Sequence, residues 1–133
     1  MENTAKTMNG LYESLGKLFY AVAMCDGSVH SNEWDKVKEL VKEDWLYVDD
    51  FTDRYGTDAA NQIEIVFDVL METSKGSNEC FGEFVEFYKE HPHAFSDEIK
   101  ALTQKTAKAI ANSFSGNNKS ELILLAKIKL LLN

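Results

Sequence analysis

The sequence predicts an all-α fold: a compact bundle of about six to seven helices in a single domain over residues 1–133. The chain contains one Pro and 7 Gly, which is too few for the many tight turns of an all-β fold. Apolar residues recur at helical spacing along nearly every segment, and no segment is predicted as a strand. An apolar fraction of 44% at this length is sufficient for a buried core.

Five predicted helices carry an apolar stripe each, and a sixth segment, Leu122–Leu132, is apolar on almost every side. Residues spaced by three and four positions share one face of a helix, so each stripe is expected to face the core. In chain order the stripes comprise Leu11, Leu15, Leu18, Phe19 and Val22; Trp34, Val37, Val41 and Trp45; Ile63, Val66, Phe67 and Leu70; Phe81, Phe84, Val85 and Tyr88; and Ile99, Leu102, Thr106 and Ile110.

Residues that end or cap helices separate these segments. Pro92 ends the fourth helix, because the residue before a proline avoids helical geometry. Ser96 is the predicted N-cap of the fifth helix, and Asn118 with Glu121 has the spacing of a capping box for the last. The remaining breaks between helices fall at Asp26-Gly27-Ser28, Tyr55-Gly56-Thr57-Asp58, Lys75-Gly76-Ser77-Asn78 and Ser115-Gly116. A short additional helix is predicted at Val48–Arg54.

The last segment presents no single polar face to water. A helix that is apolar all round is usually buried on several sides. We therefore expect Leu122–Leu132 to lie at the centre of its own bundle, or to be covered by a second copy in a two-fold homodimer. This segment is also too short, and too interrupted by Lys127 and Lys129, to insert directly into a membrane.

Charge is distributed unevenly along the chain. Residues 1–98 carry a net charge of −13 and residues 99–133 a net charge of +5, which together give −8. The acidic part repels a phosphate backbone and argues against nucleic-acid binding. It could attract divalent cations or a basic partner, or serve solubility alone. The basic end is expected to dock, through lysines such as Lys100, Lys105 and Lys108, across the acidic part.

Two consecutive predicted helices carry rows of carboxylates. Like charges at these spacings are mildly unfavourable within a helix. The rows therefore indicate a cation-binding or partner-binding surface, with a solvated helix face as the alternative. The residues are Glu64, Asp68 and Glu72 in one helix, and Glu79, Glu83, Glu86 and Glu90 in the next.

The turn after the first helix resembles half of a calcium-binding loop. Asp26, Gly27, Val29 and Glu33 match positions five, six, eight and twelve of an EF-hand. Positions one and three fall on apolar residues, so a bound ion would lack two carboxylate ligands. Asp26 and Glu33 are thus candidate metal ligands, with a helix stop followed by a helix cap as the alternative.

A helix of small apolar residues that ends in Ala23-x-x-Asp26-Gly27-x-Val29-x-x-x-Glu33 resembles the TerB-like domain family of tellurite-resistance and stress-associated proteins. The resemblance implies a helical bundle of two degenerate halves and an acidic surface that binds a divalent metal such as Ca, Mn or Mg. It also implies a non-enzymatic interaction module with a protein partner. That partner could be membrane-associated, since a related domain occurs in a membrane-anchored DnaJ-type co-chaperone.

The second half of the chain departs from the family pattern. Ala109-Ile110-Ala111 mirrors Ala21-Val22-Ala23, and Glu121 mirrors Glu33. The Asp-Gly pair is replaced by Ser115-Gly116, however, so a symmetric pair of metal sites is not expected.

Other candidate chemistry is sparse. Cys25 and Cys80 lie on apolar stretches and are expected in the core, and His91 and His93 flank a proline in a turn rather than form a metal site. Phosphate-binding loops and hydrolase motifs are not found. The start of the chain lacks the pattern of a signal peptide, which predicts a cytoplasmic protein.

The alternatives to an interaction module are a structural or oligomerising helical protein without a metal, and an enzyme with an acid pair in a helical pocket.

Overall fold

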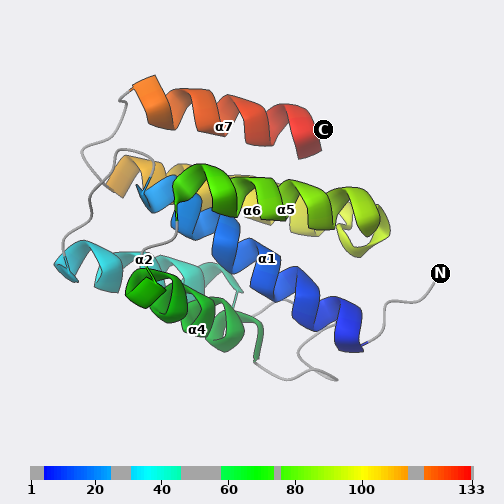
Figure 1. Cartoon of the computed structure of the whole chain (residues 1–133), viewed down its shortest axis with the longest axis horizontal. Coiled ribbons are helices and arrows are strands. Elements are labelled where there is room, and N and C mark those ends of the chain that lie inside the picture. Colours follow the sequence, from blue (N-terminus) through cyan, green and yellow to red (C-terminus); the bar gives the residue numbers. More distant parts are fainter. Residues whose placement is uncertain (1–4, 25–30, 46–57, 74–75, 114–118, 133) are drawn as a thin grey trace.

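The computed structural model describes residues 5–24, 31–45, 58–73, 76–113 and 119–132, and all regular elements in these ranges are helical (Figure 1). The prediction of an all-α bundle is therefore confirmed, while the predicted helix at Val48–Arg54 lies outside the described residues. The elements are α1 (Ala5–Met24), α2 (Ser31–Trp45), α4 (Asp58–Thr73), α5 (Ser77–Glu90), the 3₁₀ turn η1 (Pro92–Ala94), α6 (Asp97–Ser113) and α7 (Lys119–Leu132).

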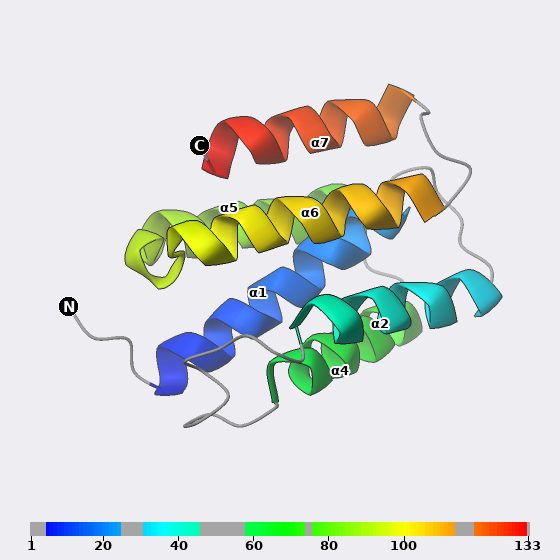
Figure 2. The same cartoon turned by 180° about the vertical axis from the view of Figure 1, so that it is seen from behind.

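The first helix is the central element of the bundle. In Figure 1, α1 runs diagonally through the molecule, with α4 and α5 in front of it and α2 and α6 behind it, and Figure 2 shows the same arrangement from the back. Between Leu11 and Ala23 only Glu13 and Lys17 are not buried. Small residues allow this packing: a Cβ on Gly16 would lie 2.8 Å from Cβ of Val66 in α4.

A buried polar contact joins two helices that are far apart in sequence, α2 and α6. The indole Nε1 of Trp45 at the end of α2 donates a hydrogen bond of 3.0 Å to Oγ1 of Thr106 in α6. The Trp45 ring also packs against Phe19 of α1, with ring centroids 6.0 Å apart. A buried N–H without an acceptor would be costly, so this pair fixes α2 against α6.

The predicted helix boundaries around α5 and α6 are confirmed. The side-chain Oγ of Ser96 accepts a hydrogen bond of 3.2 Å from the backbone N–H of Ile99, which is an N-cap interaction. Pro92 ends α5 and opens η1. Phe95 then packs edge-on against Phe84 and Tyr88 and closes the turn from α5 to α6.

The expected central position of the last helix is wrong. Figure 1 shows α7 at the outer edge of the molecule, where it packs mainly against α6 and touches α1. Its buried face comprises Leu124, Ile128 and Leu132, whereas Leu122, Ile123 and Leu130 on the other side are 52%, 47% and 79% exposed. The centre is filled by α1, which is buried on almost every side from Leu11 to Ala23 and contacts α4, α5, α6 and α7.

Candidate functional site

The acidic row of α4 is partly used for packing against α2. Lys38 Nζ lies 2.6 Å from Oδ1 of Asp68, and Lys42 Nζ lies 3.5 Å from Oε1 of Glu64. The hydrogen bond that the Lys38 ammonium donates to the Asp68 carboxylate raises the pKa of Lys38 above its ordinary value. The expected partners of these carboxylates, the basic residues of the chain's end, do not lie here, because α6 packs on α1 and α2 and α7 on α6.

The acidic row of α5 is divided between one paired and three exposed carboxylates. Lys17 of α1 lies 2.8 Å from Oε1 of Glu83. Glu79, Glu86 and Glu90 are exposed, and none of them has an ion pair within the part of the chain that the structure describes. Glu72 of α4 is likewise exposed and has no ion pair among the described residues. The carboxylates of the two rows are thus only partly neutralised by lysines.

The candidate metal ligands cannot be placed against one another. Asp26 lies outside the described residues, and the side chain of Glu33 in α2 is not among those described. Among the described residues, no group of three or more His, Cys, Asp or Glu side chains is arranged to hold a metal ion. Metal binding at Asp26 and Glu33 stays a prediction.

A shallow depression with both polar and apolar lining lies beside the acidic rows, between α1, α4 and α5. We call it the α4 groove. Its volume is about 710 Å³, and Ile65 and Val69 in its lining are 60% and 52% exposed. The carboxylates of Glu13 and Glu79 stand at its border, and Lys17, the one lysine among the described lining residues, pairs with Glu83 at 2.8 Å and with Glu13 at 4.0 Å. The described residues that line it are Glu13, Lys17, Ile65, Val66, Val69, Leu70, Thr73, Gly76 and Glu79.

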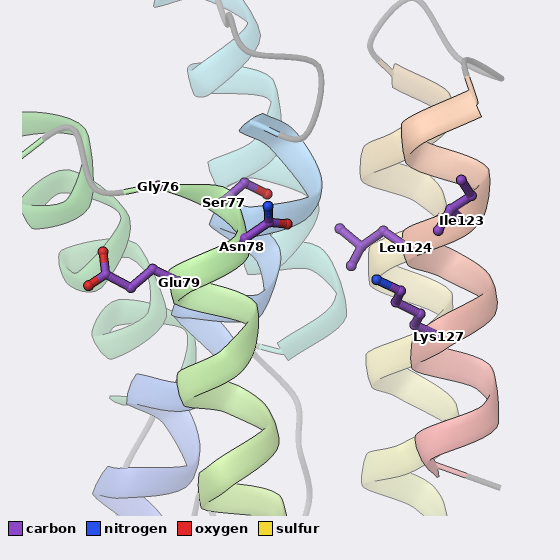
Figure 3. Close-up of a pocket in the computed structure, with 7 residues that line it drawn as sticks. All are labelled: Gly76, Ser77, Asn78, Glu79, Ile123, Leu124 and Lys127. Carbon is purple, nitrogen blue, oxygen red and sulfur yellow. The ribbon is translucent and has the colours of Figure 1, made fainter.

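A second hollow, of about 550 Å³, separates the start of α5 from α7 (Figure 3). Leu124 and Lys127 extend from α7 toward α5, while Glu79 points away from α7. The start of α5 is held in place by Ser77, whose Oγ donates a hydrogen bond of 2.8 Å to the carbonyl of Ala21. Gly76 and Glu79 contribute to both hollows, so the first turn of α5 forms the wall between them.

The described lining of the groove holds apolar and charged side chains and one threonine. It contains no His or Cys. Sequence reasoning predicted Glu79 as a surface residue but missed Ile65 and Val69. The available signal was their position outside the apolar stripe of α4, since a residue on the polar side of an amphipathic helix is expected at the surface.

Comparisons with known proteins assign no family: no family model, no curated protein and no solved structure matches the chain. The TerB-like resemblance accordingly stays a prediction. Among the described helices, none has the length and apolar character needed to cross a membrane.

Proposed function

We propose that this chain is a non-enzymatic helical interaction module that binds a protein partner in the α4 groove. The observation that carries the proposal is the pair of large apolar side chains, Ile65 and Val69, more than half exposed in a groove with carboxylates at its border. Exposed apolar surface of this kind is typical of interaction sites when it is concave and rimmed by polar residues.

The groove chemistry selects the kind of partner. A groove between helices commonly receives an amphipathic helix, with apolar anchors at positions i, i+3 or i+4, and i+7. Carboxylates at the border, within a segment of net charge −13, favour a helix whose apolar stripe is flanked by Lys or Arg. The partner of this module is therefore a basic amphipathic helix.

This function belongs to the class that the TerB-like resemblance implies. The proposal does not depend on the divalent metal of that family, which stays a prediction for Asp26 and Glu33. It depends on the groove alone, and variants of the groove therefore test it directly.

The test is binding of a designed peptide, measured by fluorescence anisotropy. The probe is a 14-residue helix of Leu and Lys with an apolar stripe, and its control has Glu at each Lys position. Burying an isoleucine side chain contributes about 1.5–3 kcal/mol. Ile65→Asp is thus expected to weaken binding by at least about tenfold.

A matched pair of glutamates separates local from general charge effects. Glu79→Gln, at the border of the groove, should weaken binding of the lysine peptide about two- to fivefold, and added salt should remove the difference. Glu86→Gln changes the net charge equally but lies outside the described lining, so it should leave affinity unchanged. Equal affinity for the two peptides, or full affinity in Ile65→Asp, would refute the proposal.

A further inference from the structure

The large apolar side chains exposed in the described part of the chain form two separate sets. One set is Ile65 and Val69 in the α4 groove, and the other is Leu122, Ile123 and Leu130 on α7. Figures 1 and 2 place α4 and α7 at opposite edges of the molecule. Because the inner face of α7 is fixed against α6, α7 cannot reach the groove of its own chain.

The outward side of α7 has the sequence pattern that we propose for a partner of the groove, which is an apolar stripe flanked by basic residues. Ile123, Ala126 and Leu130 stand at positions i, i+3 and i+7, which fall on one face at 100° per residue. All three are exposed, and the exposed Lys127 and Lys129 lie on either side of this stripe; Ile123 and Lys127 also line the hollow between α7 and α5. We call this surface the α7 outer face. It is an apolar stripe flanked by lysines.

We infer that the α7 outer face of one copy docks in the α4 groove of a second copy, so that copies of the chain associate head to tail. This inference rests on the proposed function, because it names a second copy of the chain as the partner. Charge complementarity supports that occupant. The described lining of the groove holds two carboxylates, Glu13 and Glu79, and one lysine, Lys17, whereas Lys127 and Lys129 flank the α7 outer face.

The same charges argue against the two-fold dimer, which is the alternative that the sequence leaves open for the last helix. A two-fold contact through α7 would bring identical surfaces together and crowd the Lys127 and Lys129 side chains of both copies. A head-to-tail contact joins unlike surfaces and extends to rings or chains. One helix in a groove buries less than a standard interface of about 1,600 Å², so the association should be weak and concentration-dependent.

The decisive experiment uses two variants of the full chain in analytical ultracentrifugation. Leu130→Asp disables the α7 outer face, and Ile65→Asp disables the groove. Each variant alone should be monomeric where the wild-type chain forms dimers and larger species. Both substituted side chains are exposed, so unchanged thermal melting should show that each variant remains folded.

Mixing the two variants identifies the geometry. Each copy then retains one working surface, so an equimolar mixture should form a dimer that does not grow further. If the contact were two-fold through α7, Ile65→Asp alone would still associate and the mixture would gain no mixed dimer. Either that result or a wild-type chain that stays monomeric at all concentrations and low salt would overturn the inference.

The peptide measurement distinguishes this failure from failure of the proposed function. A chain that does not self-associate, yet binds the Leu/Lys peptide through Ile65, keeps its function as a helix-binding module and loses only the second copy as partner. A chain that binds neither the peptide nor itself loses both. If both hold, the peptide should compete with self-association and return wild-type oligomers to monomer.

Discussion

Gly16 sets the distance between the central helix and α4. An added Cβ would lie 2.8 Å from both Cβ and Cγ1 of Val66, and the β-branched Val66 has little rotamer freedom to move away. We therefore expect Gly16→Ala to destabilise the fold by about 1–3 kcal/mol through overpacking. Urea denaturation gives the free energy of unfolding directly.

Gly82 provides the matched control. It is an exposed residue within α5, and a Cβ added at this position would meet nothing within 4 Å. Gly82→Ala should stabilise the chain by about 0.5–1 kcal/mol, because alanine loses less backbone entropy than glycine in a helix. Similar effects of both substitutions would contradict the close approach of α1 to α4.

At this scale the sequence predicts which face a residue occupies but not which residue it meets. Trp45 and Thr106 both belong to predicted apolar stripes, and both are buried. Their hydrogen bond spans 61 positions, and no local spacing encodes it. Ser96 could be predicted as a cap because its acceptor geometry depends only on the next three residues.

Ion pairs between α2 and α4 explain why part of the acidic row of α4 is not available to a partner. Lys38 and Lys42 of α2 are spaced by four, as are Glu64 and Asp68 of α4, and the pairs run in opposite order along the chain. Two antiparallel helices with matching i, i+4 charges can pair in this way. The spacing is visible in the sequence, but which helices are neighbours is not.

The stability of these elements at alkaline pH follows from two raised pKa values. Burial, and to a smaller degree Cys80, raises the pKa of Tyr20, and the hydrogen bond with Asp68 raises that of Lys38. Both groups lose their protons at lower pH in the unfolded chain than in the folded chain. The free energy of unfolding should therefore fall as pH rises from about 10, the ordinary pKa of tyrosine and lysine, to the folded-state values.

Urea denaturation between pH 8 and 11 measures this dependence. Tyr20→Phe should flatten the decline above pH 10, because Tyr20 is the buried member of the two groups. Lys38 is partly exposed, so Lys38→Met should flatten it less. A decline of the same slope in the wild-type chain and in Tyr20→Phe would show that Tyr20 does not govern the alkaline limit.

For the whole molecule, the hydrophobic pattern and the composition are sufficient to predict the fold class. Each predicted helix has an apolar stripe that must be buried, and the sequence contains few residues that break helices. They did not determine which helix is central. Leu122–Leu132 is the most uniformly apolar segment, yet α1 occupies the centre, where Gly16, Ala21 and Ala23 are buried. The uniformly apolar sequence of α7 indicates that each side of the helix is buried by a neighbour. It does not indicate whether that neighbour belongs to the same chain.

The candidate site was predictable only in its charged part. Glu79 belongs to a regular acidic row and was assigned to the surface. Ile65 and Val69 were not assigned, because a single apolar residue outside a stripe is common on protein surfaces and gains meaning only from its neighbours. The groove exists because α1 and α5 place Glu13 and Glu79 beside these two residues.

The edge position of α7 predicts that the molecule does not open as a single unit. Amides of α1 are enclosed by several helices and should exchange with solvent only on global unfolding. Amides of Leu124–Leu131 in α7, which packs mainly on α6, should exchange through a partial opening. The free energy of that opening should be lower by at least about 1.4 kcal/mol, equivalent to a tenfold faster rate.

Native-state hydrogen exchange at low denaturant measures both opening reactions, with the α6 amides as the control. These amides should keep protection close to that of α1, because α6 also packs against α1 and α2. If α7 docks on a second copy, higher protein concentration should slow exchange in α7, and also exchange through global unfolding in α1, because only the folded chain associates. Equal opening free energies and equal denaturant dependence in α1, α6 and α7 would instead mean that α7 unfolds only together with the core.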